Sequence, residues 1–327
     1  MVFALSPGAP ASSVLALDLL DRELSTRMPA DEWRRVLAFR QMPDFLDGLM
    51  LYGEIMPEYF SNNMLLNKVV TEADRFHILV YALYLYDTRD ANDPRTGLTL
   101  SNLQKTCKKQ GVASSGRVMA ILGIMQLAGY LTRKASVQDS RVVHLAPTPA
   151  FIRIVEGWNR AIFRIIDAVT LNDGLADSHV ELPRLGWEMR RRGAETLLNG
   201  WYLLDAYPEP AHFINRDAGW MLLLHCVAQS LRLGERREIA PVSVELRSFG
   251  KRFGVSRSHL RRLLESAHAA DLLEAPPRNG ADIRLSPRLV ASFLTCMASE
   301  LSFCREHALN GREALLDAAS AFPAKVE

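Results

Sequence analysis

The stretch GKRFGVSRSHLRRLLESAH, residues 250–268, has the pattern of two helices joined by a tight turn. Gly250 is small enough for two helices to cross closely, and Gly254 can adopt the positive φ that a sharp turn requires. Val255 can fill the space between the helices, and Ser256 is a favourable N-cap for the second one. The apolar side of that second helix, at helical spacing, consists of Leu260, Leu263 and Leu264. These features predict a helix-turn-helix.

The charges of the chain are unevenly distributed. The 39 lysines and arginines nearly balance the 37 aspartates and glutamates, so the formal net charge of +2 says nothing about a nucleic-acid partner. No acidic residue, however, occurs from Pro94 to Gln138 or from Leu246 to Leu264. Acid-free stretches with lysines and arginines around candidate reading helices suit a phosphate backbone.

A weaker copy of the pattern lies upstream, in residues 98–134. A short helix is expected over residues 100–107, a turn at Gly111 and Val112, and a second helix that Ser114 or Ser115 caps and that ends near residue 128. Residues 130–134 and 141–145 alternate enough to form two short strands joined by a polar loop, and an amphipathic helix is expected over residues 150–170. Helix, turn, helix and hairpin together make a winged helix.

Four short segments of the two copies align in the same order. QGV at 110–112 matches FGV at 253–255 with an offset of 143, and MAIL at 119–122 matches RRLL at 261–264 with an offset of 142. AGYL at 128–131 matches ADLL at 270–273, and HLAP at 144–147 matches RLSP at 284–287. Strands at 272–275 and 283–285 and a helix over 289–309 would complete the second copy. The offset drifts by only one residue in the second helix and by two in the wing loop, which indicates a duplication.

The segments CKKQGV, SSGRVMAIL and GKRFGVSRSHLRRLL resemble the small-x-x-x-Gly-hydrophobic pattern of bacterial winged-helix repressors. The surrounding helix layout is similar to MarR-like regulators, over roughly residues 72–170 and 216–309. The resemblance implies a DNA-binding fold but neither a target nor a ligand. MarR-like proteins usually carry one winged helix per chain and dimerise through flanking helices. Because both copies lie in one chain here, a monomer can imitate that dimer; a homodimer stays open.

The expected fold is mainly α with small β-hairpin wings. It comprises N-terminal helices over residues 1–63 and two tandem winged helix-turn-helix domains in a pseudo-two-fold arrangement. The first domain spans 64–172 and ends in a long helix, and the second spans 173–327. The polar segment 171–179 between them is expected to be a linker.

The second copy supplies the main candidate DNA contacts. In a winged helix the second helix of the motif enters the major groove and the wing reaches the backbone or the minor groove. Arginine suits this position because its planar guanidinium can bind guanine or a phosphate in two places. The candidates are Lys251, Arg252, Arg257, Ser258, His259, Arg261 and Arg262, with Arg278, Asn279 and Arg284 on the wing. A solvated helix face is the alternative for Arg261 and Arg262, and a solvated histidine for His259.

The first copy is a poorer candidate because its second helix is apolar. Either that helix is partly buried against another element, or it reads DNA weakly through its N-terminal end. Its candidate contacts are Ser114, Ser115, Arg117 and Gln126, with Lys105, Lys108, Lys109, Arg133 and Lys134 as phosphate contacts. Four tryptophans, at 158, 187, 201 and 220, could line a ligand pocket, although tryptophan in amphipathic helices more often belongs to a core or an interface.

The sequence points away from an enzyme and from a metal site. It contains no GxGxxG after a strand, GxxxxGK[ST], HExxH or GxSxG, and its four cysteines lack metal-ligand spacing. No cofactor is implied, and a cytoplasmic protein without a membrane span is expected. The expected function is sequence-specific binding of double-stranded DNA as a transcriptional regulator. A plasmid-type replication initiator and a protein–protein adaptor remain alternatives, and an effector ligand remains unknown.

Overall fold

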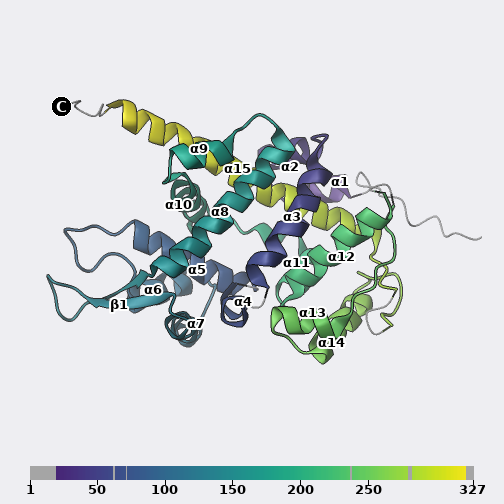
Figure 1. Ribbon diagram of the computed structural model, residues 1–327, viewed down its shortest axis with the longest axis horizontal. Helices are drawn as coiled ribbons and strands as arrows, with labels where there is room; N and C mark the ends of the chain where they lie inside the picture. Colours follow the sequence, from purple (N-terminus) through teal and green to yellow (C-terminus); the bar gives the residue numbers. More distant parts are fainter. Residues whose placement is uncertain (1–19, 62, 71, 236–237, 279–281, 322–327) are drawn as a thin grey trace, which may run out of the picture.

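Helices dominate the structure, a computed structural model that describes residues 20–321 apart from 62, 71, 236–237 and 279–281 (Figure 1). The expected mainly α fold is therefore confirmed. Within the described ranges, the only sheet is a two-stranded antiparallel hairpin. In the same ranges, no helix has the length and the apolar character needed to cross a membrane.

The N-terminal helices are α1 (Asp21–Leu24), α2 (Ala30–Arg40), α3 (Phe45–Phe60) and α4 (Met64–Val70). The first helix-turn-helix segment and its surroundings are α5 (Ala73–Asp87), α6 (Leu100–Lys109), α7 (Ser115–Leu127), β1 (Leu131–Ala135), β2 (Val143–Pro147) and α8 (Pro149–Thr170). Connecting elements follow: α9 (Leu175–Glu181), α10 (Leu185–Leu198), η2 (Leu203–Ala206) and α11 (Pro208–Ile214). The second segment is α12 (Gly219–Leu233), α13 (Leu246–Phe253), α14 (Arg257–Ala269) and α15 (Pro287–Ala321).

The turn between α13 and α14 forms as its residues predict. Gly254 has a φ of +74°, the left-handed conformation that only glycine adopts without strain. The amide of Val255 donates to the carbonyl of Gly250 over 2.9 Å, and the hydroxyl of Ser256 accepts from the amide of His259 over 3.1 Å. A Cβ atom on Gly250 would lie 2.5 Å from the Val255 carbonyl oxygen, so the small residue permits this close crossing.

The turn between α6 and α7 has matching hydrogen bonds. The amide of Val112 donates to the carbonyl of Cys107 over 3.0 Å, and Gly111 has a φ of +69°. The hydroxyl of Ser114 accepts from the amide of Arg117 over 3.3 Å, and α7 and α14 are both 13 residues long. The two helix pairs thus share their turn, their cap and their helix length.

The strands behind the two helix pairs differ. Beside α7, β1 pairs with β2 from Leu131 to Ala135, and the predicted hairpin is confirmed. Beside α14, the prediction of strands at 272–275 and 283–285 is wrong. The structure has isolated antiparallel bridges there instead, which pair Leu273 with Leu285 and Val242 with Ile283. The two prolines that follow Ala275 have no N–H group, so neither can donate a ladder hydrogen bond.

Two other expectations are corrected. The segment 171–179 is not an extended linker, because α9 begins at Leu175. The carboxylate of Asp167 accepts from the amides of Leu175 and Ala176 over 2.9 and 2.8 Å, so a side chain from α8 caps this helix. The terminal helix does not stop at residue 309, because α15 runs from Pro287 to Ala321 and is 35 residues long.

The N-terminal helices pack against both halves of the chain. Helix α3 lies against α8 and α12, and α2 lies against α15. At Gly48 of α3 a Cβ atom would come within 2.2 Å of Val169 on α8, and at Gly53 within 3.1 Å of Ala228 on α12. Glycine therefore allows α3 to approach both helices closely, and α3 joins the core of the first half to that of the second.

Candidate nucleic-acid interface and an apolar cavity

Helix α14 separates an apolar side from a basic side. Its three leucines, at 260, 263 and 264, are buried in the larger core, and the helix packs against α13 and α11. Four candidate DNA contacts are exposed on the opposite side: Arg257, Ser258, Arg261 and Arg262. The helix thus presents a basic face to solvent while its leucines hold it to the protein.

The ion pairs on this face and on the segment 282–284 are weak ones. Arg261 lies 3.4 Å from Glu265, one turn further along, and Arg284 lies 3.2 Å from Asp282. All four side chains are about half exposed, and exposed pairs of this kind contribute roughly 0–1 kcal/mol. Both arginines can therefore exchange these partners for a phosphate at little cost.

Two candidates of the second segment have partners inside the protein. Arg252 donates to Ser61 over 2.6 Å and to Glu58 over 2.7 Å. The Nε2 atom of His259 lies 3.0 Å from the carbonyl oxygen of Asp217. Lys251 and Arg278 are exposed; Asn279 lies outside the described residues. The structure thus favours Arg257, Arg261, Arg262 and Lys251 over Arg252 as contacts.

Helix α7 exposes a different surface. Its outward residues carry no charge: Ser115, Gly116, Met119, Ala120, Gly123 and Leu127. Met119 is 58% exposed and Leu127 81%. Helix α4 packs along one flank of α7, as the apolar sequence suggested, and Gln126 is only partly exposed. An uncharged face offers little to a phosphate backbone.

The basic residues of the first segment divide into two groups. The lysines of α6 and the basic residues of β1 are exposed: Lys105, Lys108, Lys109, Arg133 and Lys134. Arg117 instead forms ion pairs with Glu72 and with Asp74, the latter over 3.1 Å. Ser114 and Ser115 are exposed at the start of α7. The exposed group can still contact phosphates, whereas acidic residues near the start of α5 already compensate the charge of Arg117.

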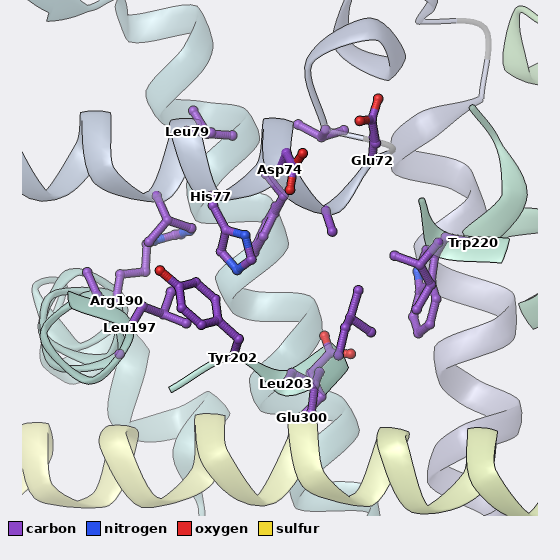
Figure 2. A pocket seen from close by; sticks show the side chains of 18 of the residues that line it. Glu72, Asp74, His77, Leu79, Arg190, Leu197, Tyr202, Leu203, Trp220 and Glu300 are labelled. Atoms are coloured by element: carbon purple, nitrogen blue, oxygen red, sulfur yellow. The ribbon is translucent and has the colours of Figure 1, made fainter. Parts of the chain in front are cut away.

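A cavity of about 530 Å³ lies between the two halves of the chain. Figure 2 shows side chains from α5, α10, α12 and α15 converging on it. Three of the four tryptophans that the sequence marks as pocket or core residues line it: Trp158, Trp201 and Trp220. Most other lining residues are apolar or aromatic, as is usual for a site that binds a small molecule.

A few charged groups face this cavity. Glu300 of α15 accepts a hydrogen bond from the hydroxyl of Tyr52 over 3.3 Å, and burial raises the pKa of its carboxyl to about 7. On α10, Arg190 donates to Asn159 and, over 2.8 Å, to the carbonyl of Val155. Burial lowers the pKa of Arg190 to about 10. No sequence motif marks Glu300, because its surroundings come from distant parts of the chain.

The structure suggests no metal centre in the ranges it describes. There, no group of three or more His, Cys, Asp and Glu side chains is arranged to hold an ion. The four cysteines are buried and unpaired, and burial raises the pKa of Cys107 to about 11. The comparisons with known proteins add no family to this geometry: no family model matches the chain, and neither does a curated protein or a solved structure.

Proposed function

We propose that this chain is a transcriptional regulator that binds double-stranded DNA with sequence specificity. It does so through two tandem winged helices arranged about a pseudo-two-fold axis. The observation that carries the proposal is the exposed arginine face of α14, presented by a helix-turn-helix whose turn and cap are well formed. An arginine on a recognition helix can bind the O6 and N7 atoms of guanine together, which gives both affinity and selectivity.

The position of α14 in its segment supports its role as the recognition helix. Its N-terminal residues Arg257 and Ser258 are exposed, and in helix-turn-helix proteins this end of the recognition helix contacts the bases. Lys251 on α13 is also exposed and can contact a phosphate. Arg278 and Arg284 lie on the segment that takes the place of the wing.

The arrangement of the two segments supports a pseudo-symmetric reader. In Figure 1, α7 and α14 both lie along the lower edge of the molecule, α7 toward the left and α14 toward the right. The matched turns and caps described above favour a duplicated unit. If both helices enter the major groove, their centres should be about 34 Å apart, which is one helical turn of DNA. Because the faces of α7 and α14 differ, the preferred site should be an imperfect palindrome or asymmetric.

The test begins with selection of bound duplexes from a random pool at two salt concentrations. The affinity for the selected site is then measured for Arg261→Ala plus Arg262→Ala. We expect a loss of roughly 1–3 kcal/mol for each base-reading contact removed. The matched control is Arg160→Ala plus Arg164→Ala, which removes the same charge from exposed positions of α8. Equal affinities of the folded double variant and the parent would reject α14 as the recognition helix.

A second candidate function, a protein–protein adaptor, is favoured by the uncharged outward face of α7. Exposed Met119 and Leu127 suit a protein partner better than a phosphate backbone. Salt dependence separates the two functions, because phosphate binding weakens steeply as salt rises. Failure to select any duplex, together with salt-insensitive binding of a protein, would favour the adaptor.

A further inference from the structure

The cavity between the two halves has walls that suit a flat or rounded apolar molecule. Aromatic rings enter from several elements, with the ring centroids of Tyr52 and Trp220 6.2 Å apart and those of Trp201 and Phe303 4.4 Å apart. Its volume of about 530 Å³ is within the range of small-molecule sites, which is roughly 300–1,000 Å³. The faces of such rings carry negative electrostatic potential and attract cations.

Glu300 adds a negative group to these walls. Its side chain points from α15 into the cavity in Figure 2, and it accepts a hydrogen bond from the uncharged phenol of Tyr52. Within the described part of the chain, no lysine, arginine or histidine forms an ion pair with Glu300. A buried carboxylate without a cationic partner is costly, and a bound cation would remove that cost.

Arg190 lies at the opposite end of the cavity and has more partners than Glu300. Besides its bonds to Asn159 and the Val155 carbonyl, the guanidinium of Arg190 lies 5.2 Å from the centre of the Trp158 ring. Its Nε atom has no hydrogen-bond partner among the described residues, but two acceptors and an aromatic face surround the rest of the group. Because Glu300 accepts a hydrogen bond from a phenol alone in the same part of the chain, it is the charged group of the two with fewer partners.

We propose that this cavity binds a lipophilic organic cation, with its apolar groups against the aromatic walls and its charge near Glu300. This ligand class goes beyond DNA binding and does not depend on it. Aromatic contacts supply the affinity, and the carboxylate of Glu300 selects for positive charge.

The same cavity connects to both helix-turn-helix segments. Glu72 and Asp74 line it and pair with Arg117 at the start of α7. Glu72 also pairs with Arg75 over 2.7 Å, and Arg75 pairs with Asp217 over 2.8 Å.

The chain of contacts ends on α14, where His259 meets the carbonyl oxygen of Asp217. A ligand that displaces the start of α5 therefore changes how α7 is held relative to α14. This regulatory consequence rests on the proposed DNA-binding function. Because coupling between two sites is reciprocal, DNA must then change ligand affinity by the same factor.

The test uses two probes of nearly the same shape and opposite charge, the tetraphenylphosphonium cation and the tetraphenylborate anion. Isothermal titration calorimetry of the full chain without DNA should show binding of the cation and at least about tenfold weaker binding of the anion. Glu300→Gln should weaken cation binding at least about tenfold and leave anion binding unchanged or stronger. Glu306→Gln, at a partly exposed position of α15 outside the cavity, is the matched control and should bind like the parent.

Equal or stronger binding of the anion, or unchanged cation binding by Glu300→Gln, would overturn the site. Glu300→Gln removes a buried charge, so it is expected to fold, and its melting temperature checks this. The coupling is tested separately, by measuring affinity for the selected duplex with and without saturating tetraphenylphosphonium. A bound cation with no effect on DNA affinity would leave the site standing and overturn the coupling.

Discussion

Arg75 of α5 and Asp217, just before α12, form a 2.8 Å ion pair that joins the first half of the chain to the second. Both side chains are at least three-quarters buried, with 20% and 25% of each exposed. A pair in such a position is shielded from salt more than a surface pair. It is therefore a sensitive point at which to test how firmly the two halves are held together.

A double-mutant cycle measures this pair. We expect Arg75→Gln and Asp217→Asn each to lower the free energy of unfolding, and the two effects to be non-additive by about 1 kcal/mol. Urea unfolding of the four proteins provides the coupling energy. Effects that add within about 0.3 kcal/mol would show that the halves are held by other contacts.

Lys251 allows a test of phosphate contact that is separate from base reading. Removal of one phosphate contact should reduce the slope of log affinity against log salt by about 1, and should weaken all sequences about equally. We expect Lys251→Ala to behave in this way. Fluorescence anisotropy with the selected duplex and a scrambled one, over a range of salt, gives both quantities. A changed sequence preference would instead place Lys251 at the bases.

Two glycines should respond to alanine with opposite signs. Gly254 has a φ of +74°, so Gly254→Ala should destabilise the protein by roughly 1 kcal/mol or more. Gly123 lies within α7 with nothing within 4 Å of an added Cβ atom, so Gly123→Ala should stabilise it by roughly 0.5–1 kcal/mol. Thermal unfolding of both variants checks the pair. Two shifts of the same sign would contradict the backbone conformations of the two residues.

The stability of the protein should depend on pH through Glu300. Because burial raises the pKa of this carboxyl from 4.5 to about 7, its ionisation opposes folding. The penalty is absent below pH 4.5, grows between pH 4.5 and 7, and is complete above pH 7. Glu300→Gln should therefore be more stable than the parent by roughly 2–3 kcal/mol at pH 8, and this advantage should vanish near pH 4.

Three groups close to Glu300 do not titrate in this window. Burial raises the pKa of Tyr52 on α3 and those of Cys296 and Cys304 on α15, so all three stay neutral. Across the cavity, burial lowers the pKa of His77 on α5, so this imidazole is mainly uncharged at pH 7 and gains its proton at lower pH.

The charged residues further along the wall are Arg190 on α10, Asp205 on η2, and Glu72 and Asp74 near the start of α5. Because tetraphenylphosphonium is charged at every pH, its affinity should fall as the pH drops below 7 and Glu300 is protonated. Glu306→Gln should show the same pH profile as the parent, whereas Glu300→Gln should lack this fall. If Glu300→Gln has the same pH profile of tetraphenylphosphonium affinity as the parent, the titrating group is another residue.

Local signals predict the helix-turn-helix elements well. A glycine at the turn, a serine cap and leucines at helical spacing lie within nine residues of Ser256, and each acts through its near neighbours. The cavity could not be predicted in this way. The hydrogen bond between Tyr52 and Glu300 spans 248 residues, and the partners of Arg117 lie more than 40 residues before it. Burial and pairing at such separations depend on the tertiary fold.

The same reason explains the error at residues 171–179. The polar sequence LNDGLADSH reads as a connection, and nothing within it caps a helix at Leu175. The cap is the carboxylate of Asp167, which belongs to the preceding helix α8. Local composition predicts the turn correctly, but the helix depends on a side chain outside the segment.

The close approach of α3 to both α8 and α12 limits how the protein can be divided. A fragment that starts after residue 60 would lose α3, and buried residues such as Val169 and Leu224 would become exposed to water. The buried guanidinium of Arg40, which donates to Thr295 over 2.7 Å, ties α2 to α15 in the same way. Neither helix-turn-helix segment should therefore fold when expressed alone, and limited proteolysis of the native chain should release no stable half.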